Sequence, residues 1–200
     1  MPIKPIDVPE TEGAFEVVHQ ALTSRAQTAS FGLPRLSRAD PRTLWIALPH
    51  RVEFLALGDL RRDGIRRDRV RTDAKADCWR FLVLEEREPI AAATAFRAGD
   101  AGFAFGDLNE GPFVKATADA IVRAEALAEV RDGQFEAALL VVPALYVLAL
   151  WLQSLPRQAA DGRPGEADLL IALRSSNPAL DPEEAMAPAP FFETLGRQAR

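Results

Sequence analysis

Residues 79–108 read WRFLVLEEREPIAAATAFRAGDAGFAFGDL, and this stretch decides the fold class. Three short runs that are apolar or rich in β-prone residues (79–84, 90–96 and 103–108) alternate with two short polar turns. Strands joined by such turns pair with their neighbours in the chain. The stretch therefore predicts an antiparallel meander of three strands. Its alanines at 91, 93 and 95 share one face, where a helix or a second sheet has room to approach closely.

Helical patterns lie on both sides of this meander. Apolar residues recur at helical spacing over residues 11–30. A second helix starts at Gly111-Pro112, with Asn109 or Glu110 available as its cap, and ends at Gly133. A last short helix is predicted over residues 191–199.

Further strands are predicted outside the meander. Residues 43–57 are expected to form two short extended pieces broken at Pro49-His50, and residues 168–173 form another strand. The predicted order is roughly α-β-β-β-α-β-β-α. We therefore expect an α+β fold whose mainly antiparallel sheet of five to seven strands carries packed helices.

The segment Phe135–Leu152 is apolar on both alternating faces. Residues 137–152 contain no charge, but they are too few for a membrane helix, which needs about twenty residues, and Pro143 interrupts them. We expect one long bent strand or two consecutive strands in the sheet interior, with Pro143 at a bulge or an edge. Because the predicted helices are too few to cover both faces, we also expect a homodimer that buries the second face.

The length of 200 residues corresponds to one domain. We assign residues 1–10 to a flexible N-terminal arm and residues 11–174 to a single α+β domain. Residues 175–200 are assigned to a C-terminal tail whose short helix packs on that domain.

The composition limits the chemistry. The net charge of −5 gives no general attraction to nucleic acid or anionic lipid, and the single Cys78 excludes an intrachain disulfide. His19 and His50 are the only histidines and lack neighbours at metal-ligand spacing, so we expect no metal and no cofactor. No secretory segment is visible at the N-terminus, and a cytoplasmic location is expected.

The most basic part of the chain is residues 59–75, with a net charge of +3. Its guanidinium groups suit phosphate oxygens and form a candidate anion-binding or nucleic-acid-binding site. Four interleaved aspartates oppose this function, and no aromatic residue is present for base stacking. We therefore expect a solvated loop and regard nucleic-acid binding as a weaker alternative. The arginines are Arg61, Arg62, Arg66, Arg67, Arg69 and Arg71.

An aromatic pair, Phe191-Phe192, stands near the C-terminus behind two Ala-Pro dipeptides. If exposed, the pair marks a docking site for a partner protein. The alternative is that the segment folds back onto the sheet.

No nucleophile elbow, phosphate loop or dinucleotide fingerprint is present, and catalytic residues are unknown. We therefore expect a non-enzymatic cytosolic domain, adaptor-like or chaperone-like, that binds a protein partner. The alternative is an enzyme or small-ligand-binding protein whose site is assembled from scattered residues such as His50, Asp107 and the arginines.

The element order over about residues 12–174 is similar to that of small type III secretion chaperone-like domains. Residues 43–75 depart from that arrangement, and the resemblance is topological and rests on no sequence motif. It implies an acidic, dimeric, non-enzymatic protein that binds partner polypeptides.

Overall fold

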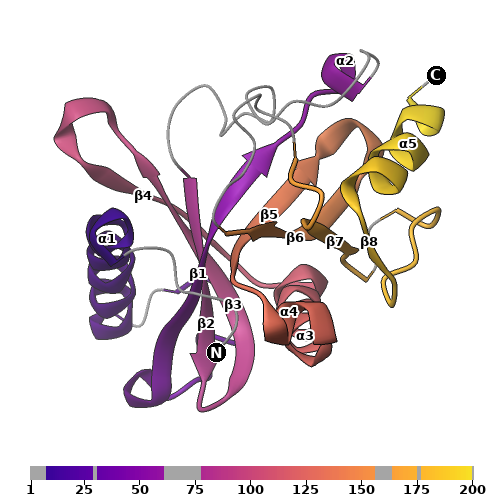
Figure 1. Cartoon of the computed structure of the whole chain (residues 1–200). Coiled ribbons are helices and arrows are strands. Elements are labelled where there is room, and N and C mark those ends of the chain that lie inside the picture. The colour runs from indigo at the N-terminus through magenta and orange to yellow at the C-terminus, as the bar shows by residue number, and fades with distance from the viewer. Residues whose placement is uncertain (1–7, 29–30, 61–77, 156–163, 175–176, 200) are drawn as a thin grey trace.

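The predicted meander is present in the computed structural model (Figure 1). The model describes residues 8–28, 31–60, 78–155, 164–174 and 177–199. Strands β2 (Cys78–Glu85), β3 (Glu88–Arg97) and β4 (Phe103–Asn109) pair in antiparallel fashion in chain order. Strand β1 (Leu44–Phe54) joins the free side of β2, also antiparallel. The meander thus becomes one half of a larger sheet.

Strand β1 is continuous, so the two extended pieces expected over residues 43–57 are one strand. The pairing with β2 shifts register between Ala47 and His50, and Leu48 lies in the left-handed region at φ 52°. Pro49 lacks only its own N–H, and a bulge accommodates that loss without ending the strand.

The second half of the sheet is built from the C-terminal residues. Strand β5 (Phe135–Val142) pairs in parallel with β1, and β6 (Val147–Ser154), β7 (Leu169–Ala172) and β8 (Ala185–Met186) follow in antiparallel order. Among the described residues, the sheet therefore has eight strands in the order β4-β3-β2-β1-β5-β6-β7-β8. The α+β class is as predicted, and the strand number exceeds five to seven because the tail adds the two-residue β8.

Two helices connect the halves. The chain leaves the edge strand β4, forms α3 (Pro112–Ala126) and α4 (Ala128–Asp132), and returns to the sheet centre as β5. The single helix expected up to Gly133 is interrupted at Leu127, which is extended. The first residue of the helix also differs from expectation, because neither Asn109 nor Glu110 caps it: Gly111 is the N-cap and makes no side-chain cap.

Glu110 is used elsewhere. Its carboxylate accepts hydrogen bonds from the backbone N–H groups of Arg35 and Leu36, at 2.9 and 2.8 Å. These contacts tie the turns that follow the first helix to the junction between β4 and α3.

Helix α1 (Val8–Gln27) packs on the meander. It buries Ala14, Val18 and Leu22 in one cluster with the alanines at 91, 93 and 95 of β3. The small side chains allow the close approach that the sequence predicted. The helix begins at Val8, three residues inside the expected flexible arm of residues 1–10.

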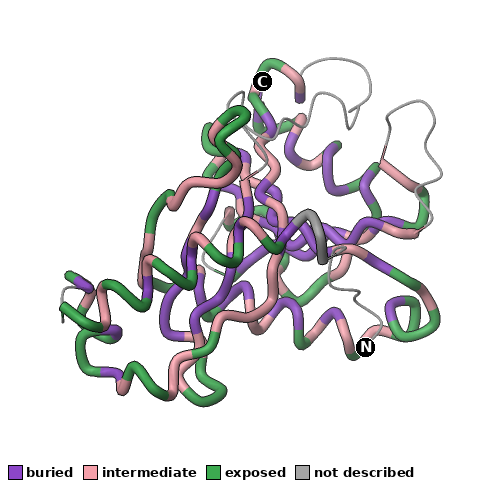
Figure 2. Tube along the Cα trace, turned by 90° about the vertical axis from the view of Figure 1, so that its left-hand side faces the viewer, coloured by how far each residue is buried: buried purple, intermediate pink, exposed green. Residues whose placement is uncertain are grey.

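Both faces of the hairpin β5–β6 are covered by the same chain. One face packs against α3 and α4, through Leu139 and Leu150, and the other packs against α5 (Pro188–Gln198), through Leu140 and Trp151. Figure 2 shows the buried residues concentrated along these central strands. The predicted burial is confirmed for the two strands, where Leu140 has no exposed surface, but the turn between them is exposed, with Tyr146 at 83%. Pro143 begins a 3-10 turn that makes the segment two strands.

This coverage removes the reason given for a homodimer. The C-terminal helix α5 supplies the second cover that sequence analysis assigned to another subunit. Self-association itself stays a prediction.

Phe191 and Phe192, which would mark a docking site if exposed, are not exposed. Both rings are buried, with exposed fractions of 0% and 8%, and Phe192 meets Trp151 edge-on at a ring distance of 6.1 Å. Neighbouring residues on a helix are both buried here because α5 packs against the sheet and also contacts the short helix α2 (Leu57–Leu60). The segment folds back onto the sheet, as the alternative proposed.

Candidate functional site

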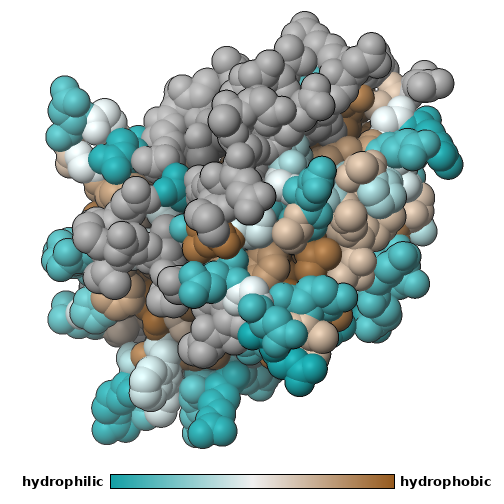
Figure 3. Space-filling view, viewed as in Figure 1, coloured by the Kyte–Doolittle hydropathy of each residue, from teal (hydrophilic) through white to brown (hydrophobic). Residues whose placement is uncertain are grey.

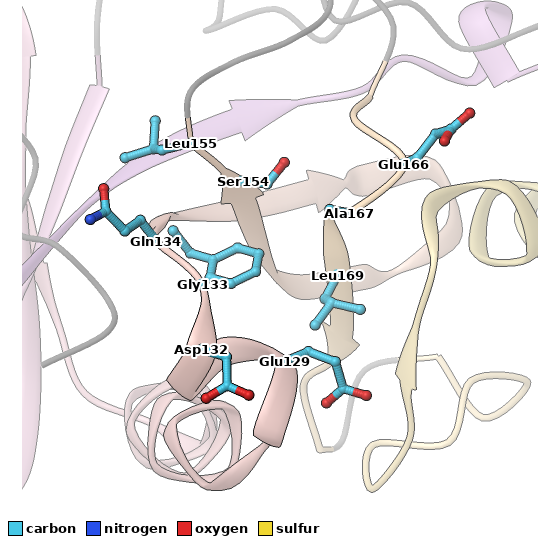
Figure 4. A pocket seen from close by; sticks show the side chains of 10 residues that line it. Glu129, Asp132, Gly133, Gln134, Ser154, Leu155, Glu166, Ala167 and Leu169 are labelled. Carbon is cyan, nitrogen blue, oxygen red and sulfur yellow. The ribbon is translucent and has the colours of Figure 1, made fainter.

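A pocket of about 450 Å³ opens where β5 begins, β6 ends and β7 begins (Figure 4). Its floor is apolar and contains Phe135, Leu155 and Leu169. Helix α4 and the turn after it form one wall, and the residues just before β7 form the other. The pocket is therefore assembled from three segments that are distant in the sequence.

The first wall depends on a glycine. A Cβ at Gly133 would lie 2.5 Å from the Phe135 ring and 3.0 Å from the carbonyl oxygen of Glu129. Only glycine allows the ring to fold against the turn in this way. Phe135 is thereby buried beneath the turn and closes the bottom of the pocket.

The second wall is held by a buried carboxylate. Asp168 has no exposed surface, and its Oδ1 accepts hydrogen bonds from the N–H and the hydroxyl of Ser154, both at 3.0 Å. Its Oδ2 accepts from Trp151 Nε1 at 3.0 Å and from the N–H of Gly165 at 3.1 Å. Both oxygens are thus satisfied, and the turn that carries Glu166 is fixed to the end of β6.

Three carboxylates surround the opening. Glu129 and Asp132 project side by side from α4, and Glu166 extends from the opposite wall, directed away from the other two (Figure 4). All three are exposed, and none has a hydrogen bond or ion pair with another residue in the described ranges. Arg131, between the first two in sequence, does not line the pocket. Within the described ranges, the rim therefore carries three carboxylates without a cationic partner over an apolar floor.

The rim does not form a metal centre. Among the residues that the structure describes, no group of three or more His, Cys, Asp or Glu side chains converges closely enough to hold a metal ion. The carboxylates are spread around the opening, which suits a larger cation better than a compact ion.

A second group of polar side chains crosses the sheet on the face that carries α3. Arg80 Nη2 donates to Asn109 Oδ1 at 3.1 Å, Asn109 Nδ2 donates to Asp107 Oδ2 at 3.1 Å, and the Thr94 hydroxyl donates to Asp107. His50 lies opposite Arg80 on β1. Arg80, Asn109, Asp107 and Thr94 form one connected chain of hydrogen bonds, which indicates that these side chains have a structural role.

His50 is not placed to serve as a general base. It has no exposed surface, and burial together with the nearby Arg80 lowers its pKa to about 4. A base must reach the proton that it removes, and this ring does not contact solvent in the described conformation. The structure brings His50 and Asp107 to one face of the sheet without forming an open site between them.

The other residues singled out in the sequence have diverse positions. The arginines at 61, 62, 66, 67, 69 and 71 lie outside the described residues. His19 is exposed on α1 and stacks on Phe15, and Cys78 is a partly buried free thiol at the start of β2.

Sequence reasoning missed the pocket. Its residues form no motif, and their only traces are the surplus of acidic residues, −8 over residues 76–200, and two glycines, Gly133 and Gly165. Gly165 also marks a close approach, since a Cβ there would lie 2.7 Å from Asp168 Oδ1. Neither the acidic surplus nor the two glycines locates the pocket unless the fold is known.

Comparison with models of known protein families, with curated proteins and with solved structures found no match for this chain. In the described part of the chain, none of the helices combines the length and apolarity that a membrane crossing requires.

Proposed function

We propose that this chain is a non-enzymatic binding domain whose pocket at the start of β5 accepts a basic side chain of a partner polypeptide. The observation that carries the proposal is the pair of carboxylates Glu129 and Asp132, which have no partner among the described residues and lie beside an apolar floor. Lysine and arginine combine an apolar stem with a charged end, and such side chains bury the stem while the charge stays near water.

The shape of the site supports an arginine in particular. The guanidinium group is planar, is weakly hydrated and stacks on aromatic rings. Phe135 lines the same pocket as Glu129 and Asp132 and offers it an aromatic ring. One pocket therefore offers an arginine side chain both apolar surface for its stem and carboxylates for its guanidinium group.

Hydrophilic residues are present beside apolar ones on the face drawn in Figure 3. Recognition that starts from charge complementarity gives specificity and a faster encounter at low salt.

The test is a peptide titration followed by fluorescence anisotropy. A labelled peptide with one central arginine is titrated against the native chain, against Glu129→Gln/Asp132→Asn, and against the control Glu12→Gln/Glu16→Gln. The control removes the same charge from exposed positions on α1.

Each exposed carboxylate contributes about 0.5 kcal/mol to such a contact, so removing both weakens binding about fivefold. The control is expected to change the Kd less than twofold, and salt is expected to weaken native binding. Equal Kd values for the native and the pocket variant, or an equal loss in the control, contradict the proposal.

A further inference from the structure

The ring of His50 is held on one side only. Its Nδ1 lies 2.7 Å from the carbonyl oxygen of Leu48, and because a carbonyl only accepts, Nδ1 carries the proton. Nε2 is therefore the unprotonated nitrogen, and it is buried with no hydrogen-bond partner. Leu48 is the left-handed residue of the β1 bulge. The neutral ring thus stabilises the bulge by a hydrogen bond to Leu48 of the same strand.

Arg80 is the charged group that favours the neutral form of this ring. Arg80 of β2 lies directly opposite, and its Nε is also buried without a partner. On the same face, β2 carries Cys78 and β4 carries Asp107, which is bonded to Thr94 and Asn109. The adjoining strand β5 offers Ala137 and Leu139 on this face. Among the described elements, α3 turns uncharged residues to the sheet, namely Val114, Ala116, Thr117, Ala120, Ile121 and Ala124.

The N-terminal half of β1 is the weakly held part of the strand. Residues 44–50 pair with β2 alone, and the pairing with β5 starts at Arg51. The bulge already interrupts the ladder to β2 between Ala47 and His50. Opening this half therefore breaks backbone pairing on one side only, together with the packing of Leu44, Ile46 and Leu48, while residues 51–54 remain between two strands.

We propose that His50 is an acid-sensitive latch: protonation of Nε2 releases residues 44–50 of β1 from β2 while the rest of the sheet stays paired. The added proton places a second cation beside Arg80 and creates a buried N–H with no acceptor. Opening exposes the ring to water and separates the two charges. This device is independent of the acidic pocket.

The direction of the pH dependence follows from the two states of the ring. Burial and Arg80 lower the pKa of His50 to about 4 in the closed form, whereas the opened form has the ordinary value of 6.5. The closed form is therefore fully favoured above pH 6.5, and the advantage falls as the pH drops toward 4. Each pH unit in this window raises the open fraction about tenfold.

The experiment measures amide hydrogen exchange between pH 7.5 and 4.5, corrected for the intrinsic exchange rate. The native chain is compared with His50→Gln, which carries no ring charge, and with the control His19→Gln, which alters the only other histidine. We expect protection of the β1–β2 amides around Ala47 and Leu82 to fall about tenfold per unit below pH 6 in the native chain and in the control. In His50→Gln the protection of the same amides is expected to stay constant over this pH range.

Three results overturn the proposal. One is an identical profile in His50→Gln, and another is an equal loss of protection in β5 and β6. The third needs no variant: a ¹³C-labelled His50 ring that titrates near pH 6.5 in the native chain shows that the latch is absent.

Discussion

Trp151 Nε1 donates a hydrogen bond to Asp168 Oδ2 at 3.0 Å, between two side chains that have no exposed surface. This contact joins the centre of β6 to the residue that precedes β7. It fixes the wall of the acidic pocket to the core of the second half of the sheet.

Replacing Asp168 by Asn is expected to lower the free energy of unfolding by about 2–4 kcal/mol. Each oxygen of Asp168 accepts two hydrogen bonds, so an amide NH₂ at either position faces donors that it does not satisfy. Urea unfolding measures the loss. The exposed Asp181, which accepts one bond from the N–H of Glu183, is the matched control, and Asp181→Asn is expected to cost under about 0.5 kcal/mol. Similar losses in both variants would show that the buried network carries no special stability.

Phe191→Ala is expected to destabilise the chain by about 3–5 kcal/mol, because the ring is fully buried in the cluster that α5 forms with the sheet. Thermal unfolding of the variant is compared with that of Val122→Ala, which trims an exposed side chain on α3. A stable Phe191→Ala chain would mean that α5 does not cover the sheet in solution.

Gly133→Ala is expected to reduce stability by about 1–3 kcal/mol and to close part of the pocket. The new methyl group would meet the buried Phe135 ring at 2.5 Å, so the ring or the turn must move. Gly58→Ala is the control, since a Cβ at that position meets no atom within 4 Å. Urea unfolding reports the stability, and peptide affinity reports the pocket. Unchanged values in both assays for Gly133→Ala would contradict the described wall.

Tyr146→Gly is expected to raise the free energy of unfolding by about 0.5–1 kcal/mol. Tyr146 adopts φ 52° at the β5–β6 turn, which costs a non-glycine residue about 1 kcal/mol, and its side chain is 83% exposed and contributes little packing. Tyr146→Ala keeps the unfavourable conformation and is expected to give no gain. Chemical denaturation of the two variants separates backbone conformation from loss of the ring.

The parts of the fold that depend on local pattern were predictable. In the meander over residues 79–108, the strands that pair are neighbours in the chain and are joined by short turns. The row of alanines on β3 correctly predicted a close approach, which α1 makes. Burial of strands β5 and β6 also followed from their two apolar faces, whereas the exposed turn between them did not.

What covers each face was not predictable, because it depends on contacts between distant segments. The sequence left two alternatives for Phe191 and Phe192, exposure or packing on the sheet, and only the contacts of α5 with the sheet and α2 decide between them. The break expected at Pro49 is a bulge because β2 continues past it on the neighbouring side. The pocket combines segments around residues 129–135, 154–155 and 166–169, which the sequence does not connect.

The most direct test of the binding proposal is an NMR titration of the ¹⁵N-labelled chain with two peptides. They differ only in one side chain, arginine in the first and the uncharged isostere citrulline in the second. We predict that the arginine peptide shifts the amide signals of Gly133, Gln134 and Ala167, which line the pocket, and that the citrulline peptide leaves them unchanged. Equal shifts with both peptides, or shifts confined to residues away from the pocket, would contradict the account.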